Sequence, residues 1–167
     1  AWFGRAAASV VRVAPTSGAL RAGAAGLAIA LGLPALAVGL VHGVLVVTEP
    51  LPVLHGFLQV LILYSCICLF GLLEAARTLT RTLRDQGLEA ARPRLRWLCS
   101  RDPDRLGAND LANGTIESLA ENLSDSVVAP LCFLVCFGVE GAVAYRAINT
   151  LDAMIGYRGE YEWLGKA

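Results

Sequence analysis

Hydrophobic and polar positions divide this chain into long uncharged runs separated by arginine-rich stretches. The runs from Ala22 to Val47 and from Leu54 to Leu73 contain no Lys, Arg, Asp or Glu. As a helix, each is long enough to cross the hydrocarbon core of a bilayer, which is about 30 Å thick. Residues 48–52 between them contain two prolines and a glutamate, which predict a tight turn. We therefore expect an N-terminal transmembrane hairpin with spans at about 22–47 and 54–73.

The arginines predict how this hairpin is oriented. Arg5, Arg12 and Arg21 precede the first run, many arginines follow the second, and the connecting turn has none. Basic residues accumulate on the cytoplasmic side of membrane proteins. We therefore expect both ends of the hairpin, and the active face, to be cytoplasmic. The protein should be a multi-pass protein of the cytoplasmic (inner) membrane, with the lipid bilayer as a partner.

The remainder of the chain predicts further helices. Residues 74–125 interleave leucines with charge, which is typical of amphipathic cytoplasmic helices or of a solvated helical linker. The apolar stretch Val127 to Val139 is too short to cross a membrane alone, and Glu140 and Gly141 interrupt it before a second helical stretch that ends at Ile155. We expect a partly inserted, re-entrant helical hairpin over 127–155, or else a third membrane helix. The predicted fold is all-α, with one membrane domain over 1–167.

The composition agrees with a membrane protein. Hydrophobic residues make up 56% of the chain and charged residues only 17%, whereas soluble domains have roughly 45–50% and 25%. The 14 basic and 14 acidic residues cancel, so no overall field attracts nucleic acid, and we expect no nucleic-acid partner. Because the chain starts at Ala1 and stops inside a polar stretch, we expect a fragment truncated at both ends.

A cluster of carboxylates is the first candidate for chemistry. Glu117, Glu121 and Asp125, with Asn122 beside them, gather opposite the apolar side of a predicted helix. One interpretation is an ordinary amphipathic helix with a solvated acidic face. The other is a site for a hard cation, because Mg²⁺ is typically held by one or two carboxylates together with water and substrate phosphate.

A polar stripe in the last hydrophobic segment is the second candidate. Tyr145, Asn149 and Asp152 follow helical spacings of four and three, with Arg146 and Thr150 adjacent. Ionisable groups at membrane depth are costly and usually functional, which favours a substrate site. Alternatively, Arg146 and Asp152 lie at the water interface and only anchor the helix.

The glycine- and tyrosine-rich stretch that follows, residues 156–162, is the third candidate. Tyr157 and Arg158 lie in it, and the planar guanidinium of Arg158 suits phosphate or carboxylate. A plain loop on the membrane surface is the alternative.

Taken in order, these segments resemble a known family. The resemblance is carried by residues 116–122 (IESLAEN), Asp125, residues 129–131 (APL), residues 144–152 (AYRAINTLD) and residues 154–157 (MIGY). They are similar to the cobalamin biosynthesis membrane proteins of the CobD/CbiB type, the adenosylcobinamide-phosphate synthase family. The chain departs from the family pattern at Arg146, where lysine is frequent; the two side chains are not equivalent at a geometric site.

The resemblance implies an amide-forming ligase of cobalamin assembly. Such an enzyme joins adenosylcobyric acid, a corrinoid, to aminopropanol or its phosphate, giving adenosylcobinamide or its phosphate, and the implied cofactors are ATP and Mg²⁺. Other cobalamin-assembly enzymes are the implied protein partners. In this scheme the carboxylates hold Mg²⁺, Asn149 and Asp152 position substrate or a second metal, and the other polar residues bind phosphate or a corrin side-chain amide. The implied site residues are Glu117, Glu121, Asn122, Asp125, Asn149 and Asp152, with Tyr145, Arg146, Thr150, Tyr157 and Arg158 binding substrate.

Two other functions fit the same pattern. A transporter or channel subunit would use the polar stripe as a solute path, as broken-helix transporters do. An inactive membrane scaffold for corrinoid enzymes would bind corrinoid or partner proteins without turnover.

Overall fold

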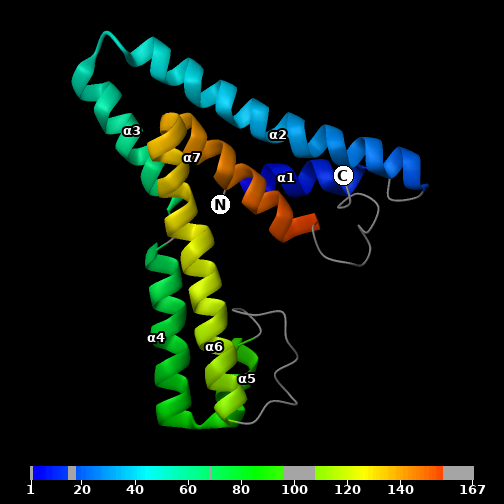
Figure 1. Cartoon of the computed structure of the whole chain (residues 1–167), viewed down its shortest axis with the longest axis vertical. Helices are drawn as coiled ribbons and strands as arrows, with labels where there is room; N and C mark the ends of the chain where they lie inside the picture. The colour runs from blue at the N-terminus through cyan, green and yellow to red at the C-terminus, as the bar shows by residue number, and fades with distance from the viewer. Residues whose placement is uncertain (1, 15–17, 68, 96–107, 156–167) are drawn as a thin grey trace. The chain divides into compact units, whose positions relative to one another are not determined.

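Every element in the part of the chain that the structure describes is helical. The computed structural model describes residues 2–14, 18–67, 69–95 and 108–155 (Figure 1). This confirms the all-α prediction for those residues. The elements are α1 (Trp2–Val13), α2 (Ala19–Thr48), α3 (Pro52–Cys66), α4 (Leu69–Gln86), α5 (Leu88–Leu95), α6 (Ala108–Leu123), the π-helical turn η2 (Ser124–Val128) and α7 (Ala129–Ile155).

Three helical stretches within the described ranges are long and apolar enough to cross a membrane. They are Leu20–Thr48, Asn113–Ile155, and the stretch Pro52–Gln86, which consists of α3 and α4 and includes Cys68 outside the described residues. Their length and composition support the expected multi-pass membrane protein. The first contains the whole predicted span 22–47, and many of its large side chains, such as Leu31 and Leu36, are exposed, as suits contact with lipid.

The predicted second span is divided between two helices. α3 ends at Cys66 and α4 begins at Leu69, so the uncharged run 54–73 is not one continuous helix. Just before the end of α3, the Ser65 hydroxyl donates a hydrogen bond to the Ile62 carbonyl over 2.7 Å. Such local side-chain bonds compete with the helical ladder and often bend or end a helix.

The chain separates into two compact units, each described by itself. The first unit comprises Ala1–Cys66 and Pro130–Ala167, and the second comprises Ile67–Ala129. The single membrane domain expected over 1–167 stays a prediction.

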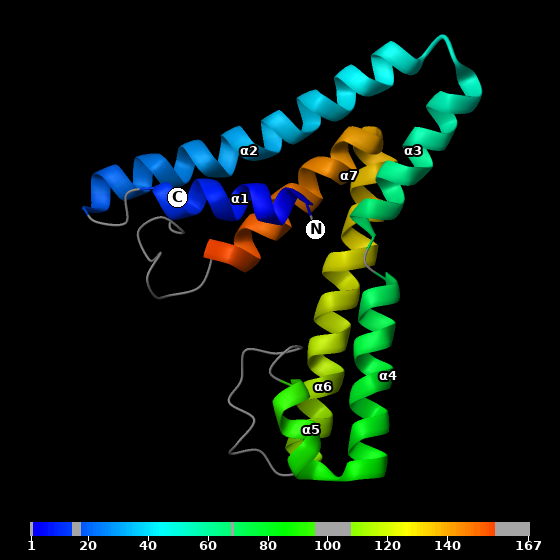
Figure 2. The ribbon, with the colours of Figure 1, turned by 180° about the vertical axis from the view of Figure 1, so that it is seen from behind.

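The second unit is an assembly of helices. α4 and α6 lie side by side, as Figure 2 shows, and α5 contacts both. Leu79 and Thr82 on α4, Ala91 on α5 and Ser118 on α6 are buried. The arginines Arg77, Arg81 and Arg84 remain exposed on α4. This is the amphipathic helical segment that the alternation of leucine and charge over 74–125 predicts.

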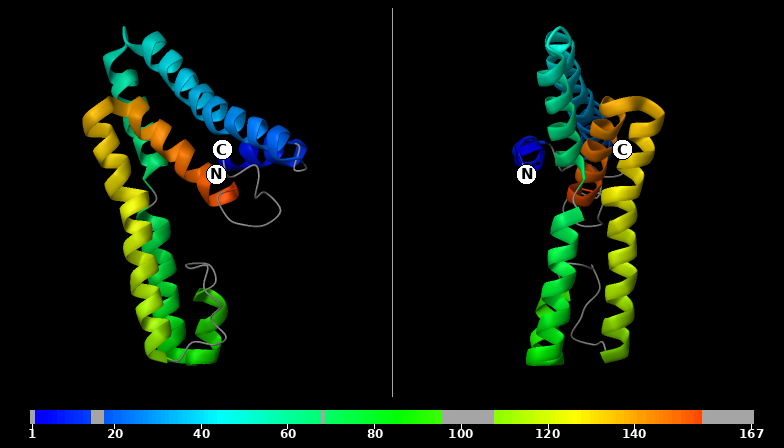
Figure 3. Two further views of the ribbon diagram at one scale, coloured as in Figure 1. Left: turned by 45° about the vertical axis from the view of Figure 1, so that its right-hand side comes forward. Right: turned by 90° about the vertical axis from the view of Figure 1, so that its left-hand side faces the viewer.

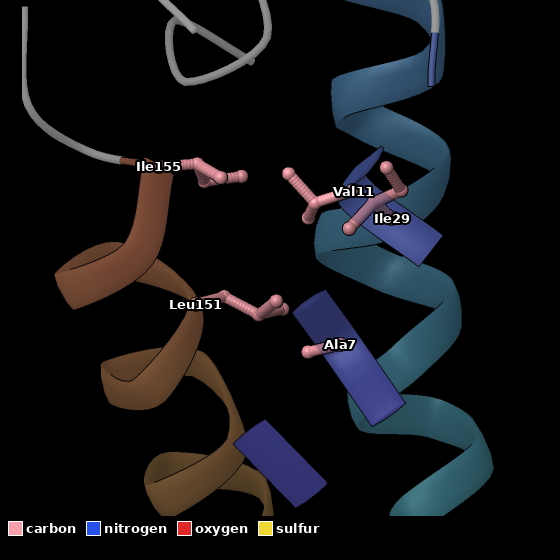
Figure 4. Close-up of a cluster of buried hydrophobic side chains, with 5 residues drawn as sticks. All are labelled: Ala7, Val11, Ile29, Leu151 and Ile155. Carbon is pink, nitrogen blue, oxygen red and sulfur yellow. The ribbon is translucent and has the colours of Figure 1, made fainter. Parts of the chain in front are cut away.

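The first unit has its core where three helices meet. Ala7 and Val11 of α1, Ile29 of α2, and Leu151 and Ile155 of α7 form one buried cluster (Figure 4). The spacing of four residues on α1 and on α7 puts each pair on one helix face. The amphipathic helix α1 is thereby packed against α2 and the end of α7.

This core gives a first prediction. Replacing Leu151, which is 3% exposed, with alanine should destabilise the protein by about 2–5 kcal/mol. Ile148 lies on the same helix and is 54% exposed. Replacing it with alanine should change the free energy of unfolding by less than about 0.5 kcal/mol. Denaturation in detergent of the complete gene product measures both. Equal destabilisation by the two substitutions would contradict this packing.

α7 reverses its direction part-way along (Figure 3). The helix is broken at Gly138, whose φ of 72° and ψ of −165° are not helical, and a positive φ is readily adopted by glycine only. The sequence predicts the interruption at Glu140 and Gly141, and the break lies just before them. After it, Gly141 lies against the first half of α7, because an added Cβ would be 2.5 Å from the Phe137 Cβ. The segment therefore forms a helical hairpin; whether it re-enters or crosses the membrane stays a prediction.

Candidate functional site

The acidic residues lie along α6 and η2 in the second unit. The side chains of Glu117 and Glu121 are exposed and that of Asp125 is half-buried. The Asn122 side-chain amide donates a hydrogen bond to the Ser118 carbonyl over 2.8 Å. Within the described ranges, no group of three or more His, Cys, Asp or Glu side chains is placed to hold a metal ion. One or two carboxylates suffice for Mg²⁺ when phosphate and water complete its coordination shell. A magnesium site with one or two of these carboxylates therefore stays a prediction.

The acidic series ends in a π-helical turn. The amide of Ala129 bonds to the carbonyl of Ser124, five residues earlier. Single π-turns inside helices are rare and frequently mark functional sites. Asp125 is the second residue of this turn.

The polar stripe of α7 is only partly accessible. Tyr145 and Asn149 are half-buried and Asp152 is exposed. The Tyr145 ring packs on Phe133 from the other half of the hairpin, with ring centroids 5.0 Å apart. Elsewhere on this half of α7, Ala147, Leu151 and Ile155 are buried, whereas Ile148 is exposed. The tyrosine ring therefore helps to hold the hairpin together.

A pocket in the first unit contains the two other predicted substrate-binding residues of α7. Its volume is about 500 Å³, and α1, α2, α3 and α7 all contribute to its wall. Arg146, which is half-buried, and Thr150 line it from α7. The remaining lining residues are mainly apolar or small: Phe3, Gly4, Ala37, Val41, Leu61, Ile62, Tyr64, Ser65, Cys66, Val143 and Ala147.

Two hydroxyl groups of this pocket already donate their protons. The Thr150 hydroxyl donates to the Arg146 carbonyl, and the Ser65 hydroxyl to the Ile62 carbonyl, each over 2.7 Å. A hydroxyl has one proton to donate and two lone pairs that accept. Toward a ligand, these oxygens therefore act as acceptors, whereas the Arg146 guanidinium acts only as a donor and a cation.

His42 and Glu140 form a contact between α2 and the returning half of α7. The Nδ1 atom of His42 and a carboxylate oxygen of Glu140 are 3.2 Å apart, with side chains 64% and 33% exposed. Val41, the neighbour of His42, lines the pocket, as does Val143 one turn after Glu140. This contact therefore joins two walls of the pocket at its edge. Neither residue is among the candidates predicted from the sequence, although a histidine and a carboxylate within apolar runs are a recognisable signal.

His55 lies in a second polar network at the turn between α2 and α3. Its Nδ1 atom is 3.1 Å from the Leu45 carbonyl, and its Nε2 atom is 3.0 Å from the side-chain nitrogen of Gln59. Because a carbonyl only accepts, the His55 Nδ1 atom donates to Leu45. Thr48 completes the network. His55 thus holds the hairpin turn closed, which is a structural role.

Comparison with known proteins shows to which family the chain belongs. The family model described as "CobD/Cbib protein" matches residues 1–167, the whole chain. The chain belongs to the CobD/CbiB family. The resemblance carried by residues 116–157 is thereby confirmed.

Curated members of the CobD/CbiB family are similar to this chain over much of its length. "Cobalamin biosynthesis protein CobD" of Dehalococcoides mccartyi is 40% identical over 114 residues, covering 68% of this chain and 37% of the relative. "Probable cobalamin biosynthesis protein CobD" of Thermococcus kodakarensis is 47% identical over 118 residues, covering 70% and 38%. The protein of that same name from Pyrococcus furiosus is 54% identical over 80 residues, covering 47% and 28%.

The chain spans less than half the length of these curated relatives. No solved structure matches it. Of the residues that the CobD/CbiB resemblance assigns to the site, those on α6 and η2 belong to the second unit and those on α7 to the first. Tyr157 and Arg158 lie outside the described residues.

The structure places residues in the lining of the Arg146 pocket that sequence reasoning missed. Ser65 and Tyr64 of α3 line the Arg146 pocket, together with Phe3 and Gly4 of α1. A tyrosine–serine pair inside an otherwise apolar run was the available signal for the α3 residues. Nothing in the spacing of Phe3 and Gly4 relates α1 to a segment more than 130 residues away.

Proposed function

We propose that the protein forms an amide bond in cobalamin assembly, in which adenosylcobyric acid is joined to aminopropanol or to its phosphate. The match of the CobD/CbiB family model to the whole chain carries this proposal. The relatives are named cobalamin biosynthesis proteins, and the candidate membrane spans agree with an enzyme of the cytoplasmic membrane. Its active face is cytoplasmic, and other cobalamin-assembly enzymes are its protein partners.

The reaction needs an activated carboxylate, because oxide is a poor leaving group. ATP would transfer its γ-phosphoryl group to an oxygen of the carboxylate, which gives an acyl phosphate and releases ADP, and Mg²⁺ would neutralise charge on the nucleotide. The amine nitrogen then attacks the acyl carbon. The bond from that carbon to the phosphate oxygen breaks, phosphate leaves, and the nitrogen loses a proton as the amide forms.

The predicted site residues have different roles in this reaction. One or two of the carboxylates Glu117, Glu121 and Asp125 would hold the magnesium ion, with the nucleotide phosphates and water as its other ligands; Glu121 is exposed on α6. Asn122 donates one N–H to the helix backbone, and its amide oxygen and second N–H are the groups that would act in catalysis. Asn149 and the exposed Asp152 lie on the substrate-facing helix α7 and position the substrate.

The substrate-binding assignments belong to α7 and to the chain that follows it. Arg146, a fixed cation with a planar fork of donors, binds phosphate. Thr150 lies one turn further along the same wall of the pocket. Tyr145, Tyr157 and Arg158 complete the set that contacts phosphate or a corrin side-chain amide.

A transporter is the second candidate, and one observation favours it. α7 is broken at Gly138 within a stretch apolar enough to cross a membrane, as in transporters whose discontinuous helices bind solute. An inactive scaffold for corrinoid enzymes is the third. Flux of aminopropanol into sealed vesicles without amide formation would favour the transporter, whereas corrinoid binding without flux or product would favour the scaffold.

The proposal is tested in membranes that lack the native enzyme and contain the complete gene product. Adenosylcobyric acid, ATP, Mg²⁺ and either amine are supplied, and the corrinoid is followed by mass spectrometry. We expect an ATP-dependent mass increase equal to the new amide, and its loss in an Asp152→Asn variant. A well-inserted protein that yields no amide with either amine would overturn the proposal.

A further inference from the structure

The pocket between α1, α2, α3 and α7 has one cation and two acceptors among its polar lining groups. Arg146 provides the cation. Ser65 and Thr150 provide hydroxyl oxygens whose protons are engaged by backbone carbonyls. A complementary ligand therefore carries one anionic group and one group with N–H donors.

The size and the walls of the pocket restrict that ligand further. A volume of about 500 Å³ lies in the lower half of the range for small-molecule sites, roughly 300–1,000 Å³. A small molecule fits in such a space, but a corrin macrocycle with its side chains does not. The walls contributed by Val41, Leu61 and Val143 are apolar, and an apolar environment strengthens the attraction between a guanidinium and an anion.

The lining of the pocket continues on its α1 and α3 sides. On the α3 side, Leu61 and Tyr64 line it and are 51% and 63% exposed. On the opposite side, the half-buried Gly4 of α1 faces Thr150, because an added Cβ would lie 3.7 Å from the Thr150 methyl carbon. The lining from α1, α3 and α7 thus surrounds the space next to Arg146 and Thr150.

We infer that this pocket is the subsite for the amine substrate, bound as a small amino-alcohol phosphate. The phosphate group binds to Arg146, and the amine donates N–H bonds to the hydroxyl oxygens of Ser65 and Thr150. Donation of these protons leaves the nitrogen lone pair of the neutral amine free to attack an acyl carbon. The inference rests on the proposed function and adds Ser65 as a specificity-determining residue.

Steady-state kinetics of the complete gene product test the kinetic consequences. Ser65→Ala should raise KM for the amino-alcohol phosphate by about 3- to 10-fold, the effect of one lost hydrogen bond, and leave KM for the corrinoid unchanged. Arg146→Met should raise the same KM by at least about 30-fold and remove the preference for the phosphorylated over the free amine. Arg146→Lys should restore part of that preference, because the charge is kept.

Two matched substitutions serve as controls. The Ser9 hydroxyl also donates to the helix backbone, at the Arg5 carbonyl over 3.1 Å, and the Thr80 hydroxyl donates to the Ala76 carbonyl over 2.9 Å. Neither residue lines the pocket. Ser9→Ala and Thr80→Val should therefore leave both KM values unchanged, in contrast to Ser65→Ala and Thr150→Val.

A binding measurement separates this inference from the proposed function. Aminopropanol phosphate should raise the melting temperature of the wild-type protein, and inorganic phosphate or free aminopropanol should raise it less. The shift should disappear in Arg146→Met and be reduced in Ser65→Ala. A shift without any amide product would overturn the proposed function and support the pocket. Amide product with the KM for the amino-alcohol phosphate unchanged in Ser65→Ala and Arg146→Met, or a corrinoid KM that rises instead, would overturn the pocket.

Discussion

Replacing Gly141 with alanine is expected to destabilise the protein by about 1–3 kcal/mol, the usual cost of forcing extra atoms into a packed site. The new Cβ would lie 2.5 Å from the Phe137 Cβ and 2.7 Å from the Phe133 carbonyl oxygen. One of these neighbours is backbone and the other is the first atom of its side chain, so a change of rotamer cannot relieve the clash. The two halves of α7 must therefore move apart.

Thermal unfolding of the detergent-purified, complete gene product measures this effect. Gly39→Ala is the matched control, because Gly39 is an exposed glycine inside α2 and an added Cβ would meet no atom within 4 Å. Its substitution should be neutral or slightly stabilising, since alanine is the better helix former. A melting temperature of the Gly141 variant equal to that of the Gly39 variant would show that the hairpin is not closed as described.

Replacing Glu121 with glutamine is expected to lower kcat for amide formation by at least about 100-fold, the scale for losing one group that stabilises transition-state charge. The substitution keeps the size of the side chain and removes its negative charge. Because Glu121 is exposed on α6, little loss of stability should accompany the loss of activity. The concentration of Mg²⁺ required for half-maximal rate should also rise, since an amide oxygen is a weaker ligand than a carboxylate.

Asp85→Asn provides the matched control for Glu121→Gln. Asp85 is an exposed acidic residue of α4 in the same unit as Glu121. Its loss should leave kcat and the requirement for Mg²⁺ unchanged. Wild-type turnover in the Glu121 variant would remove this residue from the site, and an equal loss in both variants would indicate a general effect of negative charge on the unit.

The sequence predicts the elements whose signal is local. The uncharged run 22–47 is contained in α2, because a long apolar run has few alternatives to a helix. The end of α3 inside the run 54–73 could not be predicted. It is accompanied by a hydrogen bond from Ser65 to the Ile62 carbonyl, and this bond depends on a side-chain rotamer that the hydrophobic pattern does not show. The break in α7 could be placed only approximately, because the chain contains 17 glycines and packing decides which of them adopts a positive φ.

The candidate site could likewise be predicted only in part. Spacing alone places Glu117 and Glu121 on one exposed helix face, but the π-turn at Asp125 is not visible in a periodic pattern. The Arg146 pocket requires α1 and α3 to lie against α7. Such contacts between distant segments arise from tertiary packing, so Ser65 and Gly4 were not predicted even though Arg146 and Thr150 were.

The most direct test of the proposed amide-forming activity follows the oxygen atoms of the corrinoid carboxylate. Adenosylcobyric acid labelled with ¹⁸O at both oxygens of the reacting carboxylate is incubated with the complete gene product, ATP, Mg²⁺ and aminopropanol phosphate in unlabelled water. If the carboxylate is phosphorylated and then attacked by the amine, one ¹⁸O remains in the amide and the other appears in inorganic phosphate. Absence of amide, amide formed without ATP, or amide formed without ¹⁸O in inorganic phosphate would contradict the account.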